Sequence, residues 1–332
     1  PGSAYDFLAV GETATDTFSY TLSDGQGGTD TATVTVTIIG TNDGPVAVDD
    51  TYGTDEDTVL TVGLPNAVLV NDNDLDGDTL SVSAIRTGSE SGSGTNGTVG
   101  SALTGTFGTL TLNSDGSYSY VADQAAADAL ADGESAIDTF TYTVSDGVGG
   151  LDTAEIVITV TGTNDGPVAN ADTGATDENA AITIDVLAND TDLDVTDTLT
   201  VSSVDTSATN GTVVNNGSDV SYDPGSAYDY LAVGETATDT FSYTLSDGQG
   251  GTDTATVTVT ITGTNDGPMA SADTGTTSEN AAITIDVLAN DTDLDVTDTL
   301  TVSSVDTSAT NGTVVNNGSD VSYDPGSAYD YL

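Results

Sequence analysis

The chain has 332 residues, of which 54 are acidic and only one, Arg86, is basic, so its formal net charge at pH 7 is −53. The absence of His, Cys and Trp, and of any Lys, excludes an imidazole base, a thiolate nucleophile, a Cys/His zinc site and disulfides. The charge disfavours direct binding to nucleic acids or anionic lipids, whereas abundant carboxylates suit hard cations such as calcium.

This acidity also has two simpler interpretations. One is a salt-adapted, highly soluble surface, and the other is disorder, which high charge and few aromatic residues favour. Regular strand patterns, with Tyr and Phe at recurring positions, argue against disorder. No apolar run approaches the ~20 residues that span a membrane. The sequence begins within a repeat and shows no signal peptide, so we expect a piece of a longer chain.

Residues 1–44 match the second half of a repeat. In DTFSYTLSDGQGGTDTATVTVTI, which begins at Asp16, apolar residues alternate with small polar residues on both sides of a Gly-rich segment. This alternation predicts two strands with one apolar face each, joined by a hairpin turn. The string TNDGPVA follows from Thr41, and the same junction returns at Thr163 and Thr264.

Residues 45–166 and 167–267 are predicted as two complete repeats, and residues 268–332 as the first half of the next. The Gly/Ser/Thr-rich stretch 86–112 lengthens the first complete repeat and predicts an inserted loop or hairpin. One possible helical turn follows from Ala122. Alternating segments such as AITIDVL and TLTVSSV predict further short strands. About seven short strands in ~100 residues favour a β-sandwich, so the predicted class is all-β.

Acidic residues recur at fixed places in the repeats. Six of the eight Glu occupy two repeat positions: Glu12, Glu134 and Glu235 in one, and Glu56, Glu178 and Glu279 in the other. NDNDLDGD at Asn71 returns as NDTDLDVTD at Asn189 and Asn290. An EF-hand is disfavoured because Ser83 stands at the twelfth position and strands flank the loop. SDGQGGTD resembles one nonapeptide of a calcium β-roll but occurs once per repeat, which favours an ordinary turn.

In chain order, TDEN, D-x-D, LAVGET, SDGQGG and NDGP resemble the calcium-binding order of cadherin repeats. That order is a strand Glu, a D-x-D loop, an L-D-R-E element, an A-x-D-G-G-type turn and a D-x-N-D-N-x-P linker. GTLTLNSDGSYSY at Gly108, with the motifs after it, is more closely similar to the VCBS repeat of giant calcium-dependent bacterial surface adhesins of the RTX type. The chain departs from the cadherin linker in having Gly40, Gly162 or Gly263 in place of the first Asp.

The resemblance implies tandem Ig/cadherin-like Greek-key β-sandwich domains arranged end to end, without enzymatic activity, that bind several calcium ions at interdomain junctions. For the first junction it implies the ligands Glu12, Asn42, Asp43, Asp72, Asp74 and Asp146. For the middle junction it implies Glu56, Glu134, Asn164, Asp165, Asp190, Asp192 and Asp247. For the third junction it implies Glu178, Glu235, Asn265, Asp266, Asp291 and Asp293.

The function expected from these features is a structural spacer in an extracellular adhesin or biofilm protein of the bacterial cell surface, stiffened by calcium. Its partners would be adjacent repeats of the same chain, with no nucleic acid and no membrane insertion. The alternative is a subunit of an extracellular fibre or sheath, in which half-repeats of identical molecules complete one another. A carbohydrate-binding module is disfavoured because the chain has no Trp. Glycoside hydrolysis by paired carboxylates is disfavoured because the acids recur at every repeat end, where a structural metal explains them all.

Overall fold

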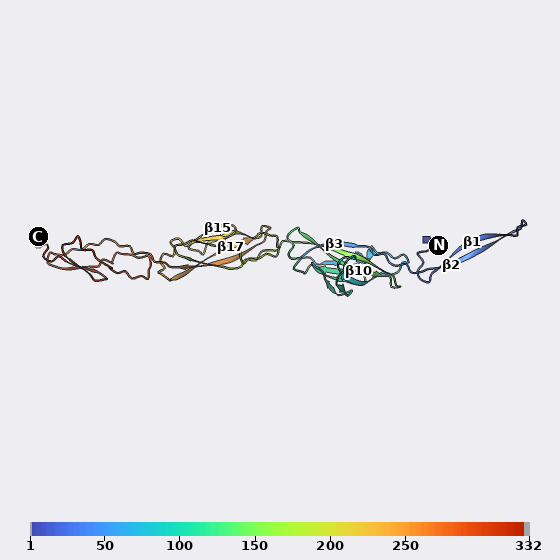
Figure 1. Ribbon diagram of the computed structural model, residues 1–332, viewed down its shortest axis with the longest axis horizontal. Helices are drawn as coiled ribbons and strands as arrows, with labels where there is room; N and C mark the ends of the chain where they lie inside the picture. Colours follow the sequence, from blue (N-terminus) through green and yellow to red (C-terminus); the bar gives the residue numbers. More distant parts are fainter. Residues whose placement is uncertain (1, 329–332) are drawn as a thin grey trace. The chain divides into compact units, whose positions relative to one another are not determined.

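The computed structural model describes residues 2–328, and within them every regular element is a strand except two short 3₁₀ turns (Figure 1). These turns are Gly2–Ala4 and Val68–Val70. No helix in the described residues is long and apolar enough to cross a membrane. The predicted all-β class is confirmed.

The chain divides into two compact units. The first comprises Pro1–Asp165 with Leu193–Asp197, and the second comprises Gly166–Asp192 with Thr198–Leu332.

The first unit contains a separate hairpin and a complete sandwich. The hairpin pairs β1 (Thr13–Ser23) with β2 (Thr29–Ile39) in antiparallel register. The sandwich has one sheet of order β3-β11-β10-β5-β6 and a second of order β4-β9-β8-β7. Its strands are β3 (Asp50–Asp55), β4 (Leu60–Val62), β5 (Ser81–Thr87), β6 (Asn96–Gly97), β7 (Ala102–Thr104), β8 (Thr109–Leu112), β9 (Tyr118–Val121), β10 (Ser135–Ser145) and β11 (Leu151–Thr161).

The second unit repeats this plan with fewer strands. Its sandwich has sheets of order β12-β18-β17-β14 and β13-β16-β15, and β19-β21-β20 forms a further small sheet. The strands are β12 (Asp172–Asp177), β13 (Ile182–Ile184), β14 (Thr200–Asp205), β15 (Thr212–Asn215), β16 (Val220–Asp223), β17 (Thr236–Ser246), β18 (Thr252–Thr262), β19 (Ile283–Ile285), β20 (Thr313–Asn316) and β21 (Val321–Asp324).

The inserted stretch 86–112 forms short strands. β6 pairs with β5 at the edge of one sheet, and β7 pairs with β8 at the edge of the other. The stretch from Ala122 forms hydrogen-bonded turns, such as Ala127 N to Gln124 O at 2.7 Å, and no helix.

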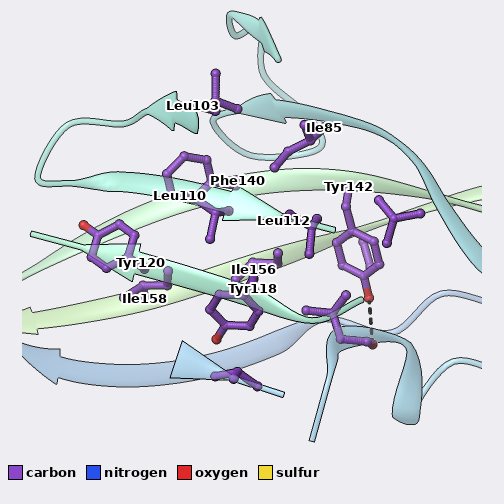
Figure 2. Packing of buried hydrophobic residues seen from close by; sticks show 14 of the residues in the cluster. Ile85, Leu103, Leu110, Leu112, Tyr118, Tyr120, Phe140, Tyr142, Ile156 and Ile158 are labelled. Atoms are coloured by element: carbon purple, nitrogen blue, oxygen red, sulfur yellow. Dashed lines mark hydrogen bonds between the residues drawn. The ribbon is translucent and has the colours of Figure 1, made fainter. Parts of the chain in front are cut away.

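Alternation along the strands builds each core, because successive side chains point to opposite faces of a sheet. In β10 and β11, Phe140, Tyr142, Ile156 and Ile158 are fully buried, while the residues between them, Thr141 and Val157, lie on the other face of the sheet. The four core side chains pack against Leu110 and other side chains of the second sheet (Figure 2). In the next repeat, the ring of Tyr222 stacks on Phe241 from the opposite sheet, with centroids 6.2 Å apart.

A buried carboxylate joins the two sheets of the second sandwich. Asp239 in β17 accepts hydrogen bonds from Gly211 N at 2.9 Å, the Tyr222 hydroxyl at 2.8 Å and the Thr209 hydroxyl at 2.7 Å. Burial opposes ionisation, yet these hydrogen bonds lower the pKa of Asp239 to about 2. This carboxylate is fully satisfied by the protein itself and is structural.

Candidate metal centres at the repeat junctions

Each TNDGP junction is attached to the Asp-rich loop of the following repeat by a two-hydrogen-bond bridge. At the first junction, Val46 N donates to Asn73 O at 2.7 Å and Asn73 N donates to Val46 O at 3.1 Å. The same bridge joins Val168 to Thr191 and Met269 to Thr292. At the first and third junctions, each of which lies within one unit, the backbone therefore brings the linker close to the D-x-D loop.

The glycine that opens each junction is needed for a close backbone approach. A Cβ atom on Gly162 would overlap the carbonyl oxygens of Leu130 and Ala131, and Gly162 N also donates to Glu134 O at 2.9 Å. Gly40 and Gly263 lie in equivalent contacts. The departure from the cadherin linker at this position thus has a steric cause: an Asp side chain does not fit there.

Three carboxylates of the first unit converge on one point. Oxygen atoms of Asp74, Asp78 and Asp146 all lie within 4.8 Å of one another. Burial raises the pKa of Asp78, and the charges of Asp74 and Asp146 raise it further. The Asn42 amide donates to Asp146 Oδ2 at 2.7 Å and lowers the pKa of Asp146. A linker amide, two loop carboxylates and a hairpin carboxylate are therefore brought together.

Several oxygens around this point are buried without a hydrogen-bond donor. They are Asn42 Oδ1, Asp74 Oδ2 and Asp76 Oδ1. Asp76 uses its other oxygen to accept from Asp43 N at 2.8 Å. Burying an acceptor without a partner is unfavourable, and burying a charge without compensation is more so. A bound cation would offset the charge of these carboxylates and give their oxygens a partner.

The third junction, within the second unit, repeats this pattern with deeper burial. Glu178 is 0% exposed, and its Oε1 accepts from Thr264 N at 2.6 Å and from the Thr264 hydroxyl at 3.0 Å. Asp295 is 1% exposed and accepts from Asp266 N at 3.0 Å. Glu178 Oε2, Asp266 Oδ2 and Asp295 Oδ1 are buried without a hydrogen-bond partner.

Like charges crowd this junction. Burial raises the pKa of Asp266, and the charges of Glu178, Asp229, Asp295 and Asp293 raise it further. Four acidic neighbours and no basic residue surround one carboxylate, since Arg86 is the only basic side chain of the chain. Such a group is stabilised by a bound cation.

The residues predicted for the middle junction are divided between the two units, so their convergence stays a prediction. Within the first unit, Glu56 accepts from Thr163 N at 2.7 Å, as Glu178 does from Thr264. Burial raises the pKa of Glu56, and the charges of Asp165 and Asp194 add to this effect. The polar atom Glu56 Oε2 is buried without a hydrogen-bond partner.

The remaining predicted residues make local hydrogen bonds. Asp190 accepts from the Tyr243 hydroxyl at 2.9 Å, and Asp72 occupies the same position beneath Tyr142, whose hydroxyl also contacts Val68 O (Figure 2). The other acceptors and their donors are Glu12 with Ala9 N, Glu235 with Ala232 N, Asp247 with the amides of Gln249 to Gly251, Asp291 with Ser271 N, and Asp293 with Asp295 N. The side-chain amides of Asn164 and Asn265 each donate to the backbone carbonyl of the next residue. Glu134 is exposed, and Asp192 lies in the Asp-rich loop that begins at Asn189.

From the sequence, Asp72, Asp74 and Asp76 could converge on one cation, whereas Asp78, Asp229 and Asp295 were missed as members of these clusters. The signal was present, because Asp72, Asp74, Asp76 and Asp78 alternate in NDNDLDGD. Asp229 belongs to SAYDYL, which recurs as SAYDFL at Asp6. No pattern indicated that this segment approaches the junction.

The donor set fits a hard divalent cation. Carboxylate and amide oxygens bind calcium, and the chain has neither the thiolate nor the imidazole that zinc and copper prefer. Fold and site together define a class of protein: tandem β-sandwich repeats with oxygen-rich acidic junctions.

Residues 42–162 and 164–263 each match the sequence profile of the bacterial cadherin-like domain. These matches cover more than half of the chain, which therefore belongs to the bacterial cadherin-like domain family. Residues 4–37 and 265–331 match the bacterial Ig domain. Domains of both kinds are structural and adhesive, not enzymatic, which agrees with the prediction from sequence, and they typically lie outside the cell.

Solved structures similar to this chain are tandem cadherin domains. Human mucin-like protocadherin EC1-2 is 14% identical over 66% of this chain and 98% of that chain, with a TM-score of 0.39. Mouse cadherin-23 EC22-24 is 17% identical over 78% of this chain and 76% of that chain, with a TM-score of 0.44. No curated protein sequence matches the chain significantly.

Proposed function

We propose that this chain is a run of spacer repeats from a bacterial cell-surface adhesin or biofilm protein, in which calcium bound at the junctions stiffens the chain. The observation that carries this proposal is the pair of buried carboxylates Glu178 and Asp295, each with one oxygen that has no hydrogen-bond partner. Family membership supports the extracellular setting.

The mechanism follows from which segments supply the oxygens. At the first junction the linker supplies Asn42, the loop supplies Asp74 and Asp78, and a hairpin supplies Asp146. A cation held by all three segments is bound best when they keep one relative position, so binding favours that position over others. Calcium, when bound, would supply the positive charge that offsets the repulsion between these carboxylates.

The affinity should suit an extracellular setting. Calcium sites of extracellular modules have Kd values of about 10⁻⁴–10⁻³ M. At calcium concentrations in that range the junctions would be largely occupied, and removal of calcium would leave like charges close together. A spacer built in this way is stiff outside the cell and flexible where calcium is scarce.

Calorimetric titration with calcium tests the proposal. We expect wild-type protein to release binding heat in the range above, and Asp78→Asn to lose affinity at one junction by roughly 10–100-fold, as removal of groups around metal ions generally does. The matched control is Asp205→Asn, which removes the same charge from an exposed turn where the carboxylate accepts from Ser207 N. Absence of binding heat, or equal effects of the two variants, would refute the proposal.

A further inference from the structure

Three differences between the two complete repeats meet at one place in the first of them. The inserted stretch 86–112 has no counterpart of equal length in the second repeat. Arg86, the only basic residue of the chain, stands where the second repeat has Asp205. Ile137 stands where the second repeat has Thr238. All three lie in or beside one hollow on the surface of the first complete repeat.

The hollow has a volume of about 500 Å³ and is lined by residues 87–89, 104–106 and 137–139. The first two segments belong to the insertion, and the third is part of β10, where Ile137 is 59% exposed. The volume lies within the ~300–1,000 Å³ of ordinary ligand sites. Loops on a rigid scaffold are common places for binding. The insertion therefore builds two walls of a cavity of ligand size beside β10.

The first wall is fixed by the single basic side chain. The Arg86 guanidinium donates to Thr87 O at 3.1 Å and to Ser89 O at 2.8 Å. From the neighbouring strand, the Thr141 hydroxyl donates to Gly88 O at 2.7 Å. Arg86 itself does not line the hollow. These hydrogen bonds hold the wall in one shape before a ligand arrives, which lowers the cost of binding.

The second wall is fixed by a buried carboxylate. Asp138 is 3% exposed, and its two oxygens accept from Thr106 N and Phe107 N, each at 3.1 Å. A Cβ atom on Gly105 would overlap both oxygens, so this wall approaches the carboxylate closely. Asp138 occupies the position that Asp239 has in the second repeat. It is structural in the same way, and it offers no unoccupied oxygen to a ligand.

Side-chain hydroxyls are the groups that the hollow offers to a ligand. Within the described residues 2–328, four lining side chains make no hydrogen bond: Ser89, Thr104, Thr106 and Thr139. The backbone beside them is already paired, since Gly105 N donates to Gly108 O at 2.7 Å and Gly88 N donates to Thr139 O at 2.8 Å. An added peptide strand needs unpaired backbone groups, whereas a hydroxylated ligand can donate to these side chains and accept from them.

The charge of the chain selects among hydroxylated ligands. A net charge of −53 repels an anionic ligand. A cationic ligand is not favoured either, because Asp138 is the one ionisable residue among those that line the hollow and both of its oxygens are occupied. The ligand that fits is neutral and rich in hydroxyl groups, with a less polar side that can pack on Ile137.

We propose that this hollow binds a sugar unit of a neutral polysaccharide, which gives the first complete repeat an adhesive role in addition to its role as a spacer. The sugar hydroxyls exchange hydrogen bonds with the Thr and Ser hydroxyls, and its C–H groups pack on Ile137. The site uses none of the junction carboxylates. No aromatic ring is among the lining residues, so the sugar does not stack and a single site binds weakly. Many copies on one surface strengthen the attachment.

Native electrophoresis of the whole polypeptide, in gels that contain dextran, mannan or galactan, tests the proposal. We expect at least one of these neutral polysaccharides to slow the protein, and the polyanion alginate to leave its mobility unchanged. Thr104→Val with Thr139→Val removes two hydroxyls but keeps the side-chain shape, and should weaken binding by about tenfold or more. The matched control, Thr238→Val with Thr240→Val, removes two hydroxyls from β17 of the second repeat and should bind like wild type.

A second variant separates lost binding from lost folding. Ile137→Thr gives the hollow the residue that the second repeat has at this position, so the sandwich should unfold at about the wild-type temperature while binding is weakened. Unchanged mobility in all three neutral gels, equal slowing by alginate, or wild-type binding by the Thr104→Val, Thr139→Val variant would overturn the proposal. An equal loss of binding in the matched control would overturn it as well.

Discussion

Two buried carboxylates in the same repeat illustrate how a structural acid differs from a candidate ligand. Asp239 accepts hydrogen bonds from backbone and hydroxyl donors on both of its oxygens. Glu178 is buried at least as deeply, yet its Oε2 has no hydrogen-bond partner. Burial alone therefore does not distinguish the two roles, whereas hydrogen-bond satisfaction does.

For Glu178→Gln, the effect on stability should change sign with calcium. The amide keeps an acceptor for Thr264 and removes an uncompensated buried charge, so in chelator the variant should unfold at the same temperature as wild type or higher. In calcium it should unfold at a lower temperature, because a ligand is weakened. Scanning calorimetry in both buffers measures this, and the same ranking in both would contradict the assigned role.

For Asp239→Asn, we expect a loss of about 2 kcal/mol in the free energy of unfolding, because charge-assisted hydrogen bonds are weakened. The pKa of Asp239 is lowered to about 2, so its stabilising effect is complete above the ordinary pKa of 3.8 and is lost as pH falls towards 2. Urea denaturation at pH 6 and pH 2.5 should show a smaller difference between variant and wild type at the lower pH. A constant difference would contradict this account.

Asp50 should give the opposite pH dependence. Burial raises its pKa to about 6, and the nearby charge of Asp72 adds to this effect. Because the folded-state pKa exceeds the unfolded value, stability is lost as pH rises through about 6. In chelator, the first complete repeat should therefore melt at a higher temperature at pH 5 than at pH 7.5. Asp50→Asn should reduce that difference, and thermal scans that find no reduction would contradict the assignment.

At the scale of elements, the strands could be predicted because alternation of apolar and small polar residues has one structural meaning. The hairpin at 16–38 follows from pattern alone, whereas the pattern of the insertion left a loop and a hairpin both open. The carboxylate cluster was only partly predictable. In NDNDLDGD, Asp72 accepts from the Tyr142 hydroxyl, whereas Asp74 and Asp78 lie close to Asp146. Which Asp faces which partner depends on the backbone geometry of the loop. An alternating run of Asp does not reveal that geometry.

The junction glycine gives a prediction at this scale. Gly162→Ala should lower the free energy of unfolding by about 1–3 kcal/mol, because its Cβ overlaps two backbone carbonyls that have no flexible atoms to move. Gly63→Ala is the matched control in the same repeat, since nothing lies within 4 Å of the new Cβ. Urea denaturation of both variants measures the difference, and equal losses would show that the close approach is unimportant.

At the scale of the whole molecule, the charge of −53 and the single Arg mean that ion pairs within the chain contribute almost nothing to compensation. The core carboxylate Asp239 accepts hydrogen bonds on both oxygens, whereas the junction carboxylates Glu178 and Asp295 each have one oxygen without a hydrogen-bond partner. The proposed dependence on external cations would thus be concentrated where one repeat meets the next. Exposed acids elsewhere, such as those in turns, are solvated and contribute mainly to solubility.

The most direct test of the central claim is small-angle scattering of the protein at low concentration, measured with calcium, after chelation and after calcium is restored. The account predicts a profile of a stiff chain in calcium, a more flexible profile in chelator, and recovery of the first profile on restoration. A profile that is the same in all three conditions would contradict it, and the buried junction carboxylates would then need another explanation.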